Sequence, residues 1–575
     1  MRVLLFSPFS YIYQHSYPEH LIGESLSSKG HDVVFMRCDG VLNKFCPSME
    51  AAGLLPESSD EKKKKICAEC QGNSVSFDKK SSYKTVYIGE FLTLDDFNLV
   101  DALIALESGK KTSAENFEFD GTPFGRICSY ELILHFKKMS IECLDDKQKA
   151  YFYAQLRGSL LSYLAMKNHL KTEKYSHALI YSPQYAINHS ASIVLEQLQV
   201  PVYFIESGTN NFYRLSTMRL WKWNEFRLVN PLLSRWSRIK NITLSESDAQ
   251  KVVKHYQTLM LGNSIAVYSE AYKGSASIRE IWSIPSEKKI LLAAMSSYDE
   301  AYAAYVAGLF PSSKVESSVF KDQLEWIQET IKFVASRNDL FLIVRVHPRD
   351  FPNKRESGKS DQARLLVHSL NSGGINSVVN WPEEKISIYD LYLQSDVLLT
   401  GWSITALEAS IVGVPVVTYD RNLPSYPEDM MYTGSTREEY FQNILSAVRK
   451  KDHSQKSYFS FKWMALNHSF GVAEICKKFH LIQQQKSKIS RVLDVCLRKI
   501  FRVGKLTRFL NANDANEGQL DLVEKMLLLN SGTFIDLVSE GVSSEHPPSD
   551  YSIIEGAIAK IRGFLGDKKR SVNGA

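Results

Sequence analysis

Short hydrophobic runs recur along the chain, and each stops at a polar or glycine-containing turn. Residues 340–346, 397–400 and 414–418 are runs of this kind, with hydrophobic side chains at consecutive positions and little alternation. That pattern is typical of strands buried on both faces of a parallel sheet. Between the last two runs, residues 405–412 have helical character and Gly413 ends them. The pattern therefore predicts a strand, a helix and a second strand.

The first half of the chain shows the same alternation. Strand and helix patterns follow one another at residues 1–6, 19–29, 32–36, 146–170, 177–181, 189–198, 202–205 and, at the start of the second half, 290–294. Residues 7–18 form a polar and aromatic loop between the first strand and the first helix. Because strands that alternate with helices predict parallel sheets, we expect an α/β fold of two doubly wound domains.

Polar residues follow the buried strands of the second half. Arg345 and His347 stand at the end of one run, and Ser403 and Thr405 follow the next. Open α/β sheets bind ligands at the carboxyl ends of their strands, where helix N-termini offer unpaired N–H groups to anions. These positions predict a phosphate-binding site.

The same residues belong to a set of motifs. Residues 345–348 read Arg-x-His-Pro, 396–403 read Asp-x-Leu-Leu-Thr-x-x-Ser, and Ala-Leu-Glu-Ala at 406–409 precedes Gly-Val-Pro-Val-Val at 413–417. This set resembles the C-terminal nucleotide-binding half of GT-B glycosyltransferases. More narrowly, it is similar to bacterial capsule and surface-polysaccharide transferases of the Kdo-transferase, sialyltransferase and CDP-glycerol polymerase type, in which the His-Pro pair contacts a cytidine nucleotide.

The resemblance implies two Rossmann-like domains, with the donor site in the second. The donor-binding residues that it implies are Ser296, Ser297, Arg345, His347, Ser403, Thr405 and Glu408. In this arrangement His347 meets the nucleotide phosphate or base, and Glu408 meets the ribose hydroxyls. The plainer alternative is that His347 only caps a strand and that Glu408 is a solvated helix residue.

Glycosyl transfer displaces a nucleotide from the anomeric carbon of a sugar. The reaction therefore needs charge stabilisation at the departing phosphate and a base for the acceptor hydroxyl. His347 is the expected catalytic group at the phosphate, and Glu19 or Glu206 is the expected base. Both carboxylates have a structural alternative, Glu19 as a first-turn helix residue and Glu206 as part of a polar turn. The expected acceptor-binding residues are Tyr17, His20, Asn188 and His189.

We expect the donor to be a CMP-activated acidic sugar such as Kdo. UDP-using families usually carry a Glu seven residues before a second Glu, whereas here Pro415 stands seven residues after Glu408. No Asp-x-Asp motif is placed at a predicted strand end, so transfer is expected to need no metal cofactor. Two other functions fit the motifs: a sugar-nucleotide 2-epimerase of the same fold, and a non-catalytic protein that binds a nucleotide or sugar.

Four cysteines lie close together in the first half. Cys38 and Cys46 are separated by seven residues and Cys67 and Cys70 by two, with a Lys-rich segment between the pairs. A Cys-x2-Cys pair is a common half-site for tetrahedral zinc. The spacing predicts an insertion, 38–70, that holds a structural zinc or an iron–sulfur cluster; the alternative is four ordinary reduced thiols.

The C-terminal part contains a basic amphipathic helix pattern at 486–510. Such a helix either docks on the body of the protein or contacts an anionic membrane surface, where a lipid-linked acceptor would be located.

The expected boundaries are an N-terminal acceptor domain at 1–240, a crossover at 241–280, a nucleotide-sugar-binding domain at 281–482 and a helical extension at 483–575.

Composition limits these expectations. The net charge of +5 is small for 575 residues, which argues against nucleic acid as a partner. No hydrophobic run approaches the roughly 18 to 20 residues that cross a bilayer, and the N-terminus lacks the features of a signal peptide. Eight cysteines suit a reducing compartment. We therefore expect a cytoplasmic enzyme, either free or peripheral on the inner face of the cytoplasmic membrane, whose partners are a nucleotide-sugar donor and a glycan, lipid-linked or protein acceptor.

Overall fold

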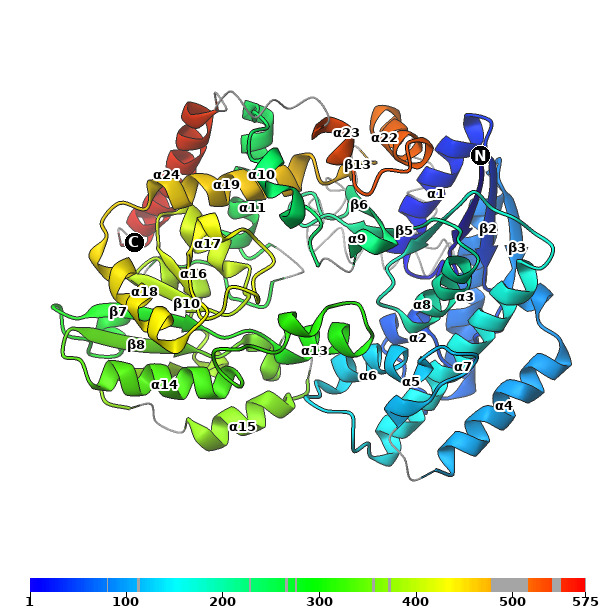
Figure 1. Ribbon diagram of the computed structural model, residues 1–575, viewed down its shortest axis with the longest axis horizontal. Coiled ribbons are helices and arrows are strands. Elements are labelled where there is room, and N and C mark those ends of the chain that lie inside the picture. The colour runs from blue at the N-terminus through cyan, green and yellow to red at the C-terminus, as the bar shows by residue number, and fades with distance from the viewer. Residues whose placement is uncertain are drawn as a thin grey trace.

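The computed structural model describes residues 1–79, 81–110, 114–226, 229–263, 267–274, 277–353, 357–370, 374–476, 515–539 and 550–573. Within these ranges the chain forms two α/β bodies that lie side by side, the N-terminal body on the right of Figure 1 and the C-terminal body on the left. Each body is built on one mainly parallel sheet, of seven strands in the first and six in the second for the described residues. The predicted fold class, two Rossmann-like domains with a helical C-terminal region, is confirmed.

The N-terminal sheet has a doubly wound strand order. Its strands are β1 (Arg2–Phe6), β2 (Asp32–Arg37), β3 (Lys84–Tyr87), β4 (His177–Tyr181), β5 (Val202–Ser207), β6 (Thr217–Lys222) and β13 (Ala473–Glu474). They lie in the order β13, β6, β5, β4, β1, β2, β3; β1 to β5 are parallel, β6 runs antiparallel to β5, and β13 runs antiparallel to β6. The strand order reverses between β1 and β4, so their carboxyl ends border the crevice where such sheets bind ligands.

Helices cover both faces of this sheet. They are α1 (Tyr13–Ser28), α2 (Pro47–Ala51), α3 (Asp60–Asp78), α4 (Leu94–Ser108), α5 (Phe124–Ile127), α6 (Ser129–Phe136), α7 (Asp146–His169), α8 (Ala186–Gln197) and α9 (Trp223–Phe226). In β1, Leu4 and Phe6 are buried on one face, and Val3 and Leu5 on the other. Because both faces are covered, hydrophobic side chains occupy consecutive positions, as the sequence pattern indicated.

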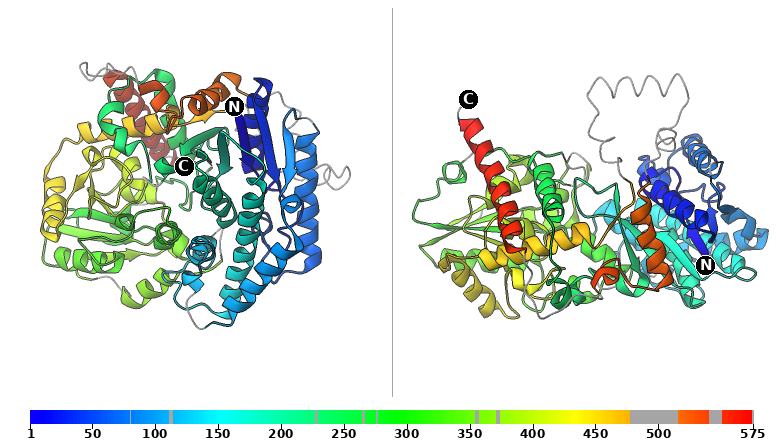
Figure 2. Two further views of the ribbon diagram at one scale, coloured as in Figure 1. Left: turned by 45° about the vertical axis from the view of Figure 1, so that its right-hand side comes forward. Right: turned by 90° about the horizontal axis from the view of Figure 1, so that it is seen from above.

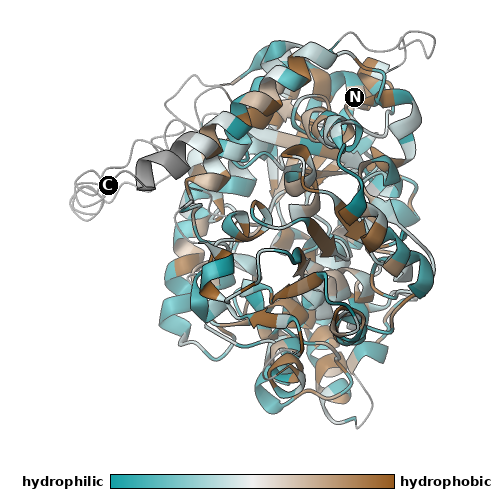
Figure 3. Cartoon of the chain, turned by 90° about the vertical axis from the view of Figure 1, so that its left-hand side faces the viewer, coloured by the Kyte–Doolittle hydropathy of each residue, from teal (hydrophilic) through white to brown (hydrophobic). Residues whose placement is uncertain are grey.

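The C-terminal sheet is parallel throughout. Its strands are β7 (Lys289–Ala294), β8 (Leu340–Arg345), β9 (Ser377–Asn380), β10 (Val397–Thr400), β11 (Val416–Thr418) and β12 (Tyr432–Thr433), in the order β12, β11, β10, β7, β8, β9. Its helices are α13 (Tyr298–Val306), α14 (Gln323–Ala335), α15 (Asp361–Ser369), α16 (Ile388–Tyr392), α17 (Thr405–Ile411), α18 (Arg437–Arg449) and α19 (Ser454–Ser469). The order reverses between β7 and β10. Figure 3, which looks at this body, shows hydrophobic strands within a shell of helices that carry much hydrophilic surface.

The segment expected as a crossover belongs largely to the C-terminal body. It contains α11 (Glu246–Met260), between the short helices α10 (Trp236–Ile239) and α12 (Ile278–Ile281). Val252, Tyr256 and Leu259 of α11 are buried in the C-terminal core. The spacing of hydrophobic residues along α11 gives the helix one hydrophobic face, and this face is the one buried in the C-terminal core.

The end of the chain serves both bodies. α22 (Glu517–Leu528) packs on α1 of the N-terminal body and is followed by the short α23 (Asp536–Ser539), whereas α24 (Tyr551–Asn573) packs on α11 and α19 of the C-terminal body. Figure 2 shows α22 and α24 well apart, each against a different body. The basic helix predicted at 486–510 lies outside the described residues. No helix in the described ranges is both long and hydrophobic enough to span a bilayer.

One helix crosses between the bodies. α13 follows β7 in the chain, yet Ala303, Ala304 and Val306 belong to the hydrophobic core of the N-terminal body. It packs beside α6, and Figure 1 shows it between the two bodies. The two bodies are therefore joined by packed side chains as well as by the chain itself.

Candidate functional site

A cavity of about 160 Å³ lies at the carboxyl edge of the C-terminal sheet. Arg345 and His347 reach it from the end of β8, and Ser403, Thr405 and Glu408 reach it from the turn after β10 and from α17. Five of the seven predicted donor-binding residues thus line one cavity. The cavity lies where the strand order reverses, which is the position that ligands take in such sheets.

Arg345 supplies the positive charge of this cavity. The residue is 4% exposed, and its Nη1 donates to Oδ1 of Asn380 at 2.7 Å. In the described part of the chain its Nε has no hydrogen-bond partner, and no carboxylate lies within ion-pair distance. Burial lowers its pKa to about 10, so the guanidinium stays charged at neutral pH. A buried cation without a carboxylate partner is suited to an anionic ligand.

His347 is a neutral donor beside that charge. Burial lowers its pKa to about 3, and the positive charges of Arg349, Arg345 and Lys137 act in the same direction. Its Nδ1 accepts from the backbone N–H of Arg349 at 3.3 Å. The proton of the neutral ring therefore sits on Nε2, where it can be donated to a phosphate oxygen.

The turn before α17 completes the cavity. Oγ of Ser403 accepts from the backbone N–H of Thr405 at 3.3 Å, and the carbonyl of Ser403 accepts from the hydroxyl of Tyr426 at 3.0 Å. Glu408 is 5% exposed, and burial alone raises its pKa to about 8. Its carboxyl group is therefore mostly protonated at neutral pH and can both donate and accept, as a pair of sugar hydroxyls requires.

The other two predicted donor residues lie elsewhere. The backbone N–H of Ser296 donates to Gln323 at 2.8 Å, and Oγ of Ser297 donates to Asp299 at 2.5 Å. Neither serine lines the cavity; Met295 does. The reason is that the chain turns away after β7 to begin α13. Met295 is therefore the last residue of this segment that lines the cavity, one residue before the predicted Ser296.

A larger, polar cavity of about 530 Å³ lies at the carboxyl ends of β4 and β5 in the N-terminal body. Glu206 lines it, and one of its oxygens accepts from Nη2 of Arg219, its cross-strand neighbour, at 2.6 Å. His15, Tyr181 and Arg214 also line it. Glu206 is thus the accessible member of the two predicted bases, although Arg219 occupies one of its lone pairs.

Glu19 lies in the core. α1 begins at Tyr13, six residues before the predicted start, so Tyr17, Glu19 and His20 are helical and their side chains are buried. Glu19 accepts from Oγ of Ser7 at 2.5 Å, and burial raises its pKa to about 8. Nδ1 of His20 lies 2.9 Å from the hydroxyl of Tyr83. None of the three lines the polar cavity.

The predicted acceptor residues of α8 are also turned inward. Asn188 donates to the carbonyl of Tyr181 at 2.6 Å, and the ring of His189 packs 5.4 Å from that of Trp223. Both lie in the first turn of α8, which begins at Ala186, three residues before the predicted start. Contacts within the core therefore occupy both of these side chains.

Arg214, Arg219 and His15 are among the residues lining the polar cavity that the sequence did not single out. The stretch 214–238 reads as a domain junction because of its tryptophans and arginines. A hairpin signal was present, since Met218 and Leu220 alternate with Arg219 shortly after the strand that ends in Glu206. That alternation places Arg219 beside Glu206.

The carboxyl edge of each sheet faces the other body. After β5, Asn210 donates to the carbonyl of Lys251 in α11 at 2.9 Å. After β8, Arg349 donates to the carbonyl of Leu134 in α6 at 3.1 Å. A ligand in either cavity therefore lies near the junction of the bodies, as a reaction between two bound substrates requires.

The four cysteines lie around a separate small pocket in the N-terminal body. The loop from β1 to α1 runs between this pocket and the polar cavity, because Pro8 and Phe9 line the first and Ile12 and His15 line the second. The cysteines are thus near the polar cavity without lining it.

Comparison with known proteins gives distant structural neighbours. No family model and no curated protein matches the sequence. Among solved structures, the beta Kdo 2,4 transferase KpsC of Thermosulfurimonas dismutans is 13% identical, with 50% of this chain and 79% of that chain covered and a TM-score of 0.29. The UDP-N-acetylglucosamine 2-epimerase of Rickettsia bellii is 12% identical over 88% of this chain and 100% of that chain, with a TM-score of 0.26. The calicheamicin glycosyltransferase CalG4 is 10% identical over 86% and 98%, with a TM-score of 0.23. Similarities this low support no argument about function, which therefore rests on the residues of the site.

Proposed function

We propose that this chain is a glycosyltransferase that takes a sugar from a nucleotide-activated donor bound in the C-terminal cavity. The observation that supports this most directly is Arg345, a buried cation with no ion-pair partner in the described chain, beside the neutral donor His347. A preorganised charge and a hydrogen-bond donor stabilise the negative charge that develops on a departing phosphate.

The residues divide the work of the reaction. Arg345 and Nε2 of His347 hold the phosphate as its bond to the anomeric carbon breaks. Glu408 binds the ribose hydroxyls, and Ser403 and Thr405 bind phosphate oxygens. On the acceptor side, Glu206 takes the proton of the attacking hydroxyl in the polar cavity of the N-terminal body. The structure supports Glu206 over Glu19 for this step, because Glu19 is sealed in the core.

We further propose a cytidine nucleotide, most simply a CMP-linked acidic sugar, as donor. Arg345 is the one cationic side chain that lines the described cavity, since His347 is neutral. A single buried cation balances the charge of one phosphate group better than that of two, which favours a donor linked through a monophosphate. The Arg-x-His-Pro motif and the absence of a second carboxylate at Pro415 point the same way.

Isothermal titration with CMP, CDP, UDP, GDP and ADP tests the donor site. We expect CMP or CDP to bind, and Arg345→Ala to weaken that binding by about 30-fold or more, because it removes a buried charge. Arg364→Ala is the matched control, since Arg364 lies on the surface of the same body and, among the described residues, pairs with Asp361 at 2.6 Å. Binding of UDP without CMP or CDP would contradict the cytidine assignment, and no binding of any nucleotide would contradict the proposed function.

A turnover assay separates the transferase from its alternatives. A transferase releases nucleotide faster when an acceptor is added. A 2-epimerase converts its sugar nucleotide with no acceptor present, and a binding protein shows no turnover with any donor.

A further inference from the structure

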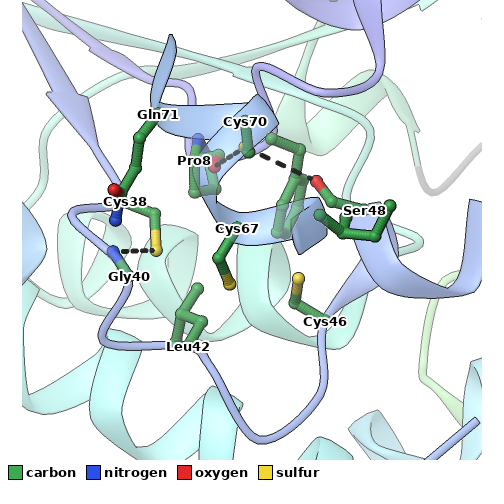
Figure 4. Close-up of a pocket in the computed structure, with 11 residues that line it drawn as sticks. Pro8, Cys38, Gly40, Leu42, Cys46, Ser48, Cys67, Cys70 and Gln71 are labelled. Atoms are coloured by element: carbon green, nitrogen blue, oxygen red, sulfur yellow. Dashed lines mark hydrogen bonds between the residues drawn. The ribbon is translucent and has the colours of Figure 1, made fainter. Parts of the chain in front are cut away.

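Four cysteines that are distant in sequence meet at one small pocket. Cys38 follows β2, Cys46 precedes α2, and Cys67 and Cys70 lie one turn apart on α3. All four side chains line the pocket, and Figure 4 shows them converging on it from three elements. All four are free thiols. The fold thus gathers the two sequence pairs into one cluster, the thiol pocket.

Polar groups contact two of the sulfur atoms of the thiol pocket. The N–H of Gly40 donates to Sγ of Cys38 at 3.3 Å. Sγ of Cys70 donates to the carbonyl of Pro8 at 3.9 Å and lies 3.9 Å from Oγ of Ser48. An amide placed like that of Gly40 stabilises negative charge on sulfur, and such amides commonly surround metal-bound thiolates.

The size of the thiol pocket limits what it can hold. Its volume is about 20 Å³, which is close to the space that one water molecule occupies. A single ion fits this space, whereas a cluster of several iron and sulfur atoms does not. Four sulfur ligands around one ion are the usual set for tetrahedral Zn²⁺, at about 2.3 Å from each sulfur.

We propose that Cys38, Cys46, Cys67 and Cys70 bind one structural zinc ion. As the side chains stand, no three described His, Cys, Asp or Glu residues surround a common point closely enough to hold an ion. Zinc binding therefore requires the sulfurs to turn inward, a movement to which rotation about χ1 can contribute. One Zn²⁺ replaces four thiol protons, which are released to solvent.

The zinc would hold a helix that hydrophobic packing holds weakly. Of the side chains of α3, only Lys63, Ser74 and Phe77 are buried, and Phe77 is the one hydrophobic residue among them. α3 would thus be fixed to the end of β2, to α2 and, through Pro8 and Phe9, to the loop after β1. Phe9 in turn contacts Tyr185 of the polar cavity, at 6.2 Å between ring centres. This inference is independent of the proposed function.

Metal analysis of the full chain, purified without chelators, tests the site. We expect about one zinc per chain, and loss of that zinc to a chelator in Cys46→Ser and in Cys67→Ser. Cys143→Ser is the matched control, because Cys143 is exposed and lies outside the thiol pocket. Cobalt added to metal-stripped wild-type protein should give the charge-transfer absorbance of thiolate-bound Co²⁺, a readout that does not depend on whether the variants fold.

Two results would overturn the inference. One is folded wild-type protein that carries no zinc, takes up none and keeps the same thermal stability with added Zn²⁺. The other is iron with the visible absorbance of an iron–sulfur cluster, which would show that the pocket expands beyond a single ion.

Discussion

At the scale of single residues, burial sets the protonation of the groups that line the C-terminal cavity. At neutral pH Arg345 is positively charged, the ring of His347 is neutral, and the carboxyl group of Glu408 is mostly protonated. The three groups together present one positive charge and two neutral hydrogen-bond donors. An anionic ligand therefore meets no negative charge from these groups at neutral pH.

We expect His347→Ala to lower kcat by roughly 100- to 1,000-fold, the usual cost of removing one donor to a developing negative charge. Thermal stability should change little, since the only described hydrogen bond of the ring is to the N–H of Arg349. Initial rates of nucleotide release and a thermal melt check both points. His368→Ala on exposed α15 is the control, and wild-type turnover by the His347 variant would rule out its assigned role.

Glu408 should make nucleotide binding depend on pH. Below pH 8 the carboxyl is mostly neutral; as pH rises past about 8 it ionises and brings into the cavity a negative charge that opposes an anionic nucleotide. The Kd for nucleotide should then rise by up to about tenfold per pH unit, and Glu408→Gln should flatten this dependence. The raised pKa also lowers stability as pH increases from 4.5 towards 8, because only the folded state keeps the proton. Nucleotide titrations of wild type and of Glu408→Gln at pH 7, 8 and 9 measure the pH dependence of Kd. Equal pH dependence in the two proteins would count against the assigned role of Glu408.

Most of the predicted donor residues line one cavity, whereas the predicted acceptor residues lie in the core, and the difference has a physical reason. Arg345, His347 and Ser403 follow hydrophobic strands buried on both faces, so the ends of those strands are sharply marked. The placement of the Tyr17 and Glu19 side chains depends on where α1 begins, and Pro18 within the helix made that start hard to predict. A proline is usual near a helix start and rare inside one, so the sequence pattern favoured the later position.

At the scale of elements, α13 is the part that sequence periodicity could not place. Its alanines are compatible with either body, and only the long-range packing against α6 decides between them. A buried ion pair ties the start of α13 to the turn after β8: Nη2 of Arg349 lies 2.9 Å from Asp299, and both side chains are less than 5% exposed. Arg349 also donates to Leu134 of the N-terminal body.

Arg349→Ala should reduce the free energy of unfolding by about 3 to 5 kcal/mol, because it leaves the carboxylate of Asp299 buried without its partner. The double variant Arg349→Ala with Asp299→Ala should lose less, since neither charge is then buried alone. Urea unfolding of the two variants and wild type measures the difference. A double variant less stable than the single one by the full cost of a second truncation would show that the pair acts through packing alone.

At the scale of the whole molecule, the last helix is tied to the C-terminal body by a charge pair without solvent contact. Nζ of Lys462 in α19 contacts Asp550, and both side chains are fully buried. Asp550 also accepts from the backbone N–H of Leu244 at 2.8 Å and from the hydroxyl of Tyr458 at 2.9 Å. Three segments that are far apart in sequence thus meet at one carboxylate before α24.

Asp550→Ala should therefore destabilise the chain by about 3 to 5 kcal/mol, as expected when a buried lysine loses its partner. Hydrogen exchange should rise first in α24, which packs on α11 and α19. Asp521→Ala is the control, because Asp521 pairs with Lys29 at the surface and should cost less than about 1 kcal/mol. Equal losses in the two variants would contradict the assigned weight of the buried pair.

The return of α13, β13 and α22 to the N-terminal body affects how such a protein can diversify. All three are encoded after residue 289, yet they complete the sheet, the core or the outer layer of the first domain. A single genetic crossover between the two halves would join a first domain to segments shaped for a different partner. A working chimera would have to carry residues 298–306 and 473–528 together with the first half. We therefore expect the ligand preferences of the two cavities to change by substitutions around them and not by exchange of whole domains.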